Sequence, residues 1–290
     1  MQPRIDTGAI ETHPRTLAGP NRMNPFPVVA LRAFRLLGNE NTETRELMDT
    51  VAPDPVFVAN LLQCANSALT GITRQVRTVR HAVTVLGRDR LRGLILTAAL
   101  RALKGSSGWT PACQNWWRHS VASALLTEGL ASATSTHRPA AYSAGLLHDI
   151  GRLALFTALK PEQSRNYLAA VAGNSLPVVE IERLMFVEDH CLIGAGLLTG
   201  WQFPGELVEA AARHHDDDGP WLVAAGCRLA TALGFTVFES RPAEDANRVL
   251  ASLPAAVEAG LAEMPPSVLE ALCERIESFE SLPPAGQKPG

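Results

Sequence analysis

The sequence has few cysteines, few aromatic residues and no long apolar run, and each shortage excludes a class of protein. Its five cysteines are scattered along 290 residues and form no C-x-x-C pair: Cys64, Cys113, Cys191, Cys227 and Cys273. Such usage excludes a disulfide framework and is typical of reduced thiols in a cytosolic protein. Because aromatic residues make up only 6% of the chain, the core must consist mainly of leucine, alanine and valine.

Membrane and targeting segments are also missing. The strongest apolar stretch, 91–103, is interrupted by Arg92 and Arg101 and falls short of the roughly 18 residues that a membrane-spanning helix needs. The first residues lack the basic-then-apolar pattern of a secretory signal. A formal net charge of -3 argues against general nucleic-acid binding. We therefore expect a cytoplasmic protein with neither a membrane nor nucleic acid as its partner.

Helical patterning runs through most of the chain, and no segment keeps the period-two alternation of a strand. The fold class is therefore predicted to be all-α. Asp54 followed by Pro55 predicts a helix start, and Thr42 is expected to cap a short helix that runs through Met48. Gly87 should mark a joint, and the apolar pattern over 140–159 predicts one continuous helix.

An adjacent imidazole and carboxylate, His148 and Asp149, lie inside this otherwise apolar helix. A buried carboxylate without a partner is costly, so the pair must be hydrogen-bonded within the protein or bound to a cation. For an isolated pair the structural hydrogen bond is the more common outcome. Arg152 lies four residues after His148, on the same predicted helix face, where it could contact an anion.

Small residues surround the pair and also recur further along the chain. Gly145 and Gly151 would let a second helix approach closely. The stretch Gly194 to Gly200 resembles a dinucleotide-binding loop, but its glycine spacing differs and no strand precedes it, so close helix packing explains it better.

Further histidines could complete a metal site: His81, His119, His190, His214 and His215. Imidazole and carboxylate are suitable ligands for Fe, Mn, Zn or Ni, and such residues on facing helices can hold one or two metals. Each histidine also has a plain structural interpretation, as a half-buried capping residue or part of a solvated loop. Sequence spacing leaves both interpretations open.

An ordered set of motifs adds to this evidence. The first half of the chain contains Asp54-Pro55, Leu61-Leu62, Asn66-Ser67, Ala82-Val83 and Leu86-Gly87; the second contains Trp117-x-His119-Ser120, Ala144-Gly145-Leu146-Leu147-His148-Asp149-Ile150-Gly151, Glu188-x-His190-x-x-x-Gly194-Ala195, Trp201-x-x-Pro204 and His214-His215. In this order they resemble an HDOD domain over residues 24–218. Outside this range we predict a disordered tail at 1–23, a C-terminal helical extension at 219–281 and a disordered tail at 282–290.

The resemblance implies a compact, all-helical HD-like fold and a role in bacterial signal transduction. HDOD domains are relatives of the HD phosphohydrolases and the HD-GYP cyclic-dinucleotide phosphodiesterases, but mostly lack demonstrated catalysis. It further implies metal ligation by six residues: His119, His148, Asp149, His190, His214 and His215. Arg152 stands where the enzymes have a phosphate-contacting lysine and keeps its charge without its geometry. If the protein were an enzyme, Asp149 and Arg152 would be its catalytic residues.

Two departures from the enzymes count against catalysis. Where they carry a metal-ligating aspartate after an alanine, this chain has Ala230 followed by Thr231, and Gly219-Pro220-Trp221 replaces the GYP segment. Losing a carboxylate weakens the hold on a divalent metal. The acidic run 216–218 could substitute only if its side chains reached inward.

Two functions remain. The first is a non-catalytic signalling module that binds a partner protein or a small ligand; the second is a metal-dependent phosphohydrolase for nucleotides or cyclic dinucleotides. The arginine-rich segment 74–104 could be a patch for an acidic partner, although solvated helix faces explain it better. If the ligand set is right, its six side chains should converge on one pocket, with His119 and His190 within about 12 Å of Asp149.

Overall fold

The computed structural model describes residues 26–72, 75–103, 110–134, 140–238, 246–252 and 266–280, and the predicted tails at 1–23 and 282–290 lie outside them. All regular elements of the described residues are helices, so the predicted all-α fold is confirmed. They are α1 (Val28–Gly38), α2 (Thr44–Val51), α3 (Pro55–Ala65), the short 3₁₀ helix η2 (Ala68–Thr70), α4 (Val79–Ala102), α5 (Pro111–Ala133), α6 (Ala141–Leu147), α7 (Ile150–Ala158), α8 (Pro161–Ala172), α9 (Val178–Met185), α10 (His190–Gly200), α11 (Gly205–Arg213), α12 (Trp221–Ala232), α13 (Ala246–Ala251) and α15 (Pro266–Glu280). In this part of the chain, none of the helices has the length and apolarity needed to cross a bilayer.

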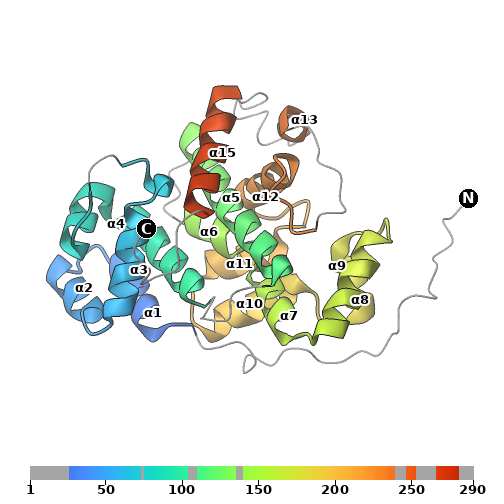
Figure 1. The fold of residues 1–290 in the computed structure, drawn as a ribbon, viewed down its shortest axis with the longest axis horizontal. Coiled ribbons are helices and arrows are strands. Elements are labelled where there is room, and N and C mark those ends of the chain that lie inside the picture. Colours follow the sequence, from blue (N-terminus) through green and yellow to red (C-terminus); the bar gives the residue numbers. More distant parts are fainter. Residues whose placement is uncertain are drawn as a thin grey trace, which may run out of the picture.

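The helices form a central bundle with a smaller group on either side (Figure 1). Helices α1 to α4 pack together on one side, and α8 and α9 lie on the other. In the centre, α5 packs along α6 and α12, while α10 packs against α7 and α11. Helix α15, near the C-terminus, reaches back to α5 and η2. The bundle therefore combines elements from the middle and the end of the sequence.

Several helix ends follow the local signals. The carboxylate of Asp54 accepts a hydrogen bond from Phe57 N at 2.9 Å, which makes it the expected cap of α3. Gly87, with φ of 76°, forms the expected joint inside α4. The cap expected at Thr42 is wrong, because α2 begins at Thr44 after Glu43 and has no side-chain cap.

The predicted continuous helix over 140–159 is also wrong. It is broken into α6 and α7, and His148 and Asp149 lie at the break. Asp149 has φ and ψ of -109° and 20°, and its carbonyl accepts a hydrogen bond from the indole nitrogen of Trp116 at 2.8 Å. Apolar periodicity continues across the break, so the pattern could not reveal it.

Glycines let the central helices touch, as expected from the small residues in the sequence. A Cβ atom added to Gly151 on α7 would lie 1.9 Å from the carbonyl oxygen of His190 on α10, and one added to Gly145 would lie 2.7 Å from Ser123 O on α5. Gly194 takes part in the same α7–α10 approach, whereas Gly196 has open space beside it. In the glycine stretch that resembles a dinucleotide loop, Gly194 therefore serves helix packing.

The arginine-rich segment has a structural use that the sequence did not indicate. The Arg88 guanidinium donates to the carbonyl oxygens of Thr42, Leu36 and Asn39 at 2.9, 2.8 and 2.7 Å. It therefore satisfies carbonyls at and beyond the C-terminal end of α1 and ties α1 to α4. Arg92 stacks over the Phe34 ring, with its guanidinium carbon 3.9 Å from the ring centroid.

We expect Gly151→Ala to destabilise the protein. The added methyl would meet backbone rather than a movable side chain, so α7 and α10 must separate, at a cost of about 1–3 kcal/mol. Guanidinium-induced unfolding followed by circular dichroism measures this change. The matched control is Gly196→Ala on α10, which meets nothing within 4 Å and should be neutral or gain up to about 1 kcal/mol. Equal stability of the two variants would contradict the close approach.

Candidate metal centre

The structure brings all six predicted ligands together from separate elements. His119 comes from α5, His148 and Asp149 from the α6–α7 break, His190 from the start of α10, and His214 and His215 from the residues that follow α11. Ring centroids are separated by 5.3 Å for His119–His148, 4.8 Å for His148–His214 and 5.1 Å for His190–His215. Asp149 Oδ1 lies 3.5 Å from His190 Nε2. His81, on α4, belongs to none of the donor groups found among the described residues.

Backbone carbonyls orient three of these imidazoles. The Nδ1 atoms of His119, His148 and His214 lie 2.8, 2.7 and 3.1 Å from the carbonyl oxygens of Phe235, Gly145 and Ala211. A carbonyl oxygen can only accept, so each Nδ1 carries the proton and each Nε2 keeps a lone pair. Metal-binding histidines are commonly held in this way, with the ring nitrogen opposite the metal donating to a carbonyl or carboxylate.

His190 is held by a carboxylate that the sequence analysis missed. Glu182, fully buried on α9, accepts hydrogen bonds from the backbone nitrogen and Nδ1 of His190 at 2.9 and 2.5 Å. It also accepts one from the Tyr167 hydroxyl. The nearby motif had drawn attention to Glu188, and nothing in the pattern of 178–185 separates Glu182 from its neighbour Glu180. Only the packing of α8, α9 and α10 distinguishes the two.

The interior of the cluster is rich in lone pairs and poor in protons. The Nε2 atom of His190 lies 3.3 Å from His214 Nε2 and 3.2 Å from His215 Nε2. Both Asp149 carboxylate oxygens and His148 Nε2 are buried without a hydrogen-bond partner. Buried polar atoms are normally paired, and a divalent cation accepts electron pairs from this kind of donor set. The residues present therefore fit a metal.

Arg152 is the buried cation of the cluster. Its Nε lies 3.3 Å from Asp149 Oδ1 and 3.8 Å from Glu182 Oε1, and its Nη2 lies 3.2 Å from His190 Nε2. Its nearest anions are thus two carboxylates of the protein itself. The helix face that Arg152 was expected to share with His148 does not exist, because α6 ends at Leu147 and Arg152 lies on α7. The guanidinium also faces the Phe238 ring, 5.2 Å from its centroid.

Burial sets the protonation of the cluster. It lowers the pKa of His119 and of His215 to about 4, and it lowers the pKa values of His148, His190 and His214 well below their usual range. Burial also raises the pKa of Asp149 to about 7, against the opposing effect of Arg152. At neutral pH the imidazoles are therefore neutral and do not have to lose a proton before they bind a metal.

The described residues contain three groups of possible metal donors, and inside each group the donor atoms lie within 4.8 Å of one another. The groups are His190, Cys191, His214 and His215; His148, Asp149 and His214; and His119, His148 and Cys227. The groups overlap at His148 and His214, so they form one extended cluster. It includes two cysteines, Cys191 and Cys227, that the sequence had indicated only as reduced thiols.

The carboxylate lost at position 231 is not replaced by the acidic run. The Thr231 hydroxyl donates to the carbonyl oxygen of Cys227 at 3.2 Å, within its own helix α12. Asp216 and Asp218 are exposed and pair with Arg213, with N–O distances of 3.1 and 2.6 Å. Asp216 lines the same cavity as His215, but no residue of the acidic run belongs to the donor groups found among the described residues.

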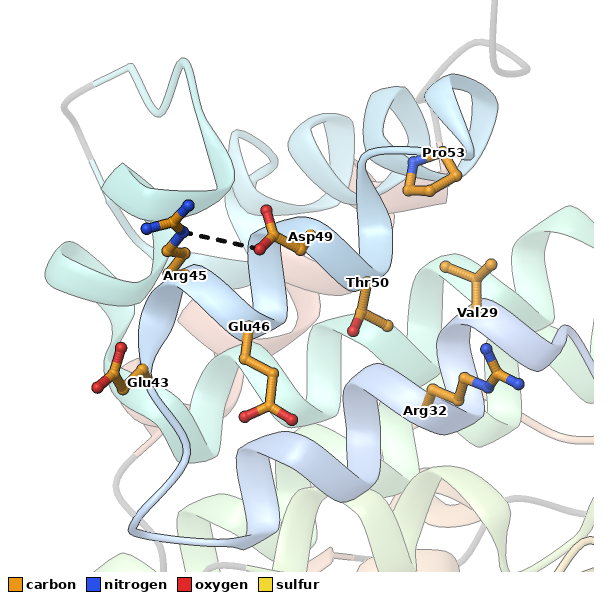
Figure 2. A pocket seen from close by; sticks show the side chains of 8 residues that line it. All are labelled: Val29, Arg32, Glu43, Arg45, Glu46, Asp49, Thr50 and Pro53. Carbon is orange, nitrogen blue, oxygen red and sulfur yellow. Dashed lines mark ion pairs between the residues drawn. The ribbon is translucent and has the colours of Figure 1, made fainter.

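A cavity of about 560 Å³ adjoins the cluster, with His119, Arg152, His215, Cys227 and Thr231 among its lining residues. A second cavity, of about 450 Å³, lies between α1 and α2 (Figure 2). It is lined mainly by exposed charged side chains, such as the Arg45–Asp49 pair with an N–O distance of 3.9 Å. Exposed pairs of this kind bind and stabilise little. The cavity beside the histidines is therefore the candidate functional site.

The sequence matches the model of the HDOD domain family over residues 23–217, more than half of the chain. The chain belongs to the HDOD family. This confirms the resemblance identified from the ordered motifs, among them the His148-Asp149 pair and the paired histidines His214 and His215.

Solved HDOD-like structures share the fold. An HDOD domain protein of unknown function from Geobacter sulfurreducens has a TM-score of 0.74 and 23% identity, over 90% of this chain and 93% of that one. A protein named as a phosphohydrolase, from Shewanella amazonensis SB2B, has a TM-score of 0.68 and 22% identity, over 90% and 94%. One named as a signal transduction protein, from Marinobacter aquaeolei VT8, has a TM-score of 0.65 and 26% identity, over 89% and 58%.

A curated but uncharacterized protein from Treponema pallidum (strain Nichols) is 25% identical over 194 residues, which make up 66% of this chain and 37% of that protein. This HDOD chain thus spans little more than a third of that relative's length. The similarity therefore concerns one part of a longer protein.

The hydrogen bonds of Glu182, which holds His190, can be tested by replacing each of the two tyrosines of the chain. Tyr167→Phe removes a buried hydrogen bond to the Glu182 carboxylate, and bonds to charged groups contribute about 1.5–3 kcal/mol. The control is Tyr142→Phe, whose hydroxyl bonds the neutral Thr97 hydroxyl at 2.9 Å and should cost about 0.5–1.5 kcal/mol. Urea unfolding of both variants measures the difference. A smaller loss for Tyr167→Phe would contradict a charged Glu182 in this role.

Proposed function

We propose that this HDOD chain is a regulatory signalling module that binds a divalent metal in its histidine cluster without turning over phosphoesters. Its output is the binding of a partner protein or a small anionic ligand. The observation that carries the proposal is the combination of an ordered ligand cluster with Thr231 in place of a carboxylate. The module keeps the means to hold a metal but lacks one of the anionic groups that hydrolysis in related enzymes depends on.

The residues that would hold the metal are His148, Asp149, His190, His214 and His215, with His119 at the cavity end. Fe, Mn, Zn and Ni are the ions that this donor set suits. A bound divalent ion supplies Lewis-acid polarisation and neutralises negative charge. Support comes from the unpartnered Asp149 oxygens and His148 Nε2, and from the carbonyls that fix the imidazoles.

Arg152 gives the module a way to bind an anion. It lines the cavity and carries a buried positive charge. Burial lowers the pKa of its guanidinium, but Asp149 and Glu182 together raise that pKa by more than burial lowers it. The net pKa is raised, so the charge persists at neutral pH. If Asp149 were bound to a metal, its charge would neutralise Arg152 less, and the guanidinium would attract an anion in the cavity more strongly. The ligand class favoured by this arrangement is a small phosphate or carboxylate compound.

The alternative function is a metal-dependent phosphohydrolase that acts on a nucleotide or cyclic dinucleotide. The retained six-residue cluster and the cavity beside it favour this reading. Against it stands the Thr231 hydroxyl, which is turned to its own helix backbone. A neutral hydroxyl is a weak ligand for a divalent ion and cannot accept a proton from water. The non-catalytic module is therefore the better-supported function.

Metal content provides the first test. Purified protein should carry one or more divalent ions by mass spectrometry, and His148→Ala should weaken the retention of metal at least about tenfold, because His148 belongs to two donor groups. Thr231→Asp should strengthen it by adding an anionic oxygen. His81→Ala, on α4 outside these groups, is the matched control and should leave metal content unchanged. Equal metal content in all four proteins would refute the cluster.

Turnover provides the second test. Protein loaded with Mn or Fe should show no hydrolysis of cyclic dinucleotides or of bis-p-nitrophenyl phosphate above the protein-free rate, because the carboxylate expected at position 231 is missing. An active HD-GYP phosphodiesterase in the same assay is the positive control. Metal-dependent turnover by the wild type that Asp149→Asn abolishes would replace the proposal with the hydrolase.

A further inference from the structure

A thiol stands at the cavity end of the cluster. Cys227 Sγ on α12 lies 3.4 Å from His119 Nε2, and Cys227, His119 and His148 form one of the donor groups whose atoms lie within 4.8 Å. The sequence motifs that identify the family include neither this cysteine nor a role for it. Its role must therefore be inferred from its surroundings in the structure.

Both imidazoles keep an Nε2 lone pair, and that of His119 accepts the hydrogen bond of the Cys227 thiol. His119 and His148 each use Nδ1 for a backbone carbonyl, and His148 Nε2 is fully buried without a hydrogen-bond partner. Around a tetrahedral zinc-type ion, metal–nitrogen bonds of about 2.0 Å and metal–sulfur bonds of about 2.3 Å put neighbouring donors roughly 3.3–3.6 Å apart. The observed Sγ–Nε2 distance of 3.4 Å already matches this spacing.

Cys227 also stands where it can compensate for Thr231. Positions 227 and 231 are one helical turn apart on α12, so they share a face, and both line the cavity beside His119. The carboxylate that related enzymes place at position 231 would have pointed to the same end of the cluster. A thiolate from position 227 would place a negative charge one turn earlier, as a soft sulfur ligand and not as the hard carboxylate oxygen that position 231 lacks.

The second cysteine of the cluster is less suited to this role. Cys191 Sγ lies 3.5 Å from His190 Nε2, but that nitrogen also meets Arg152 Nη2 at 3.2 Å. Cys191 is also not among the lining residues of the cavity beside the cluster, whereas Cys227 is one of them. The group of His119, His148 and Cys227 opens on the cavity, which Arg152 also lines.

We propose that His119, His148 and Cys227 form a thiolate-containing site for a borderline or soft divalent ion of the zinc or cobalt class, with the fourth position facing the cavity. The inference deepens the proposed function, since it assigns part of the same cluster and shares His148 with it. When the metal binds, the Cys227 S–H bond breaks, its proton leaves to solvent and a sulfur–metal bond forms. Thiolate ligation shifts metal preference from Mn toward Zn and Co.

Cobalt titration tests the site on the full chain. Metal-free wild type titrated with Co²⁺ should develop a near-ultraviolet thiolate-to-cobalt charge-transfer band together with tetrahedral visible bands. Cys227→Ser should lose the charge-transfer band and bind Co²⁺ at least about tenfold more weakly. Cys191→Ser should keep the band, and so should the neutral control Cys273→Ser on α15. The double variant Cys227→Ser with Thr231→Asp should regain binding without the band.

Each outcome decides the proposal. Loss of the band in Cys191→Ser instead, its persistence in Cys227→Ser, or Co²⁺ bound by the wild type without any band would overturn it. If Cys227→Ser does not fold by circular dichroism, ¹¹³Cd NMR of the wild type distinguishes one sulfur ligand from nitrogen and oxygen ligands alone. If no sulfur ligand is found, the thiolate site is wrong but the proposed non-catalytic function is not affected. If phosphoesters are hydrolysed, the non-catalytic function is wrong but the evidence for a sulfur ligand is not affected.

Discussion

Buried charge is the constraint around which the centre of this molecule is built. Arg152 lies between Asp149 and Glu182, at 3.3 and 3.8 Å, and all three are removed from water. An ion without a partner in such surroundings costs several kcal/mol, so the groups can be buried only together. Each helix that packs here must therefore deliver its side chain accurately, and the glycine contact between α7 and α10 brings the His190 end of α10 against the residues that follow Asp149.

In the proposed module, the same constraint would join metal binding to anion binding. The imidazoles are kept neutral by burial, while Arg152 keeps its charge through its carboxylate partners. A cation and a guanidinium compete for Asp149. A change of metal occupancy would thus alter the field that Arg152 projects into the cavity, which is how a structural cluster of this kind could serve a signalling module.

The sequence predicted the fold class, the family and the convergence of the six candidate ligands, because apolar periodicity and motif order carry that information. It did not predict the break at His148–Asp149, since the apolar pattern continues through it, nor the part played by Glu182, which resembles any glutamate on an amphipathic helix. Cys227 was also missed. Its neighbour in space, His119, is 108 residues away, and no spacing rule connects two residues so far apart.

That separation would govern how the proposed site acquires a metal. The donors from His119 to Cys227 come from five parts of the bundle, so the unfolded chain offers only adjacent pairs such as His214 and His215. Closing such long loops around an ion is entropically unfavourable, and the ion can bind strongly only after the helices have assembled. Metal binding would therefore occur after folding, so a bound metal would slow unfolding and leave the folding rate unchanged.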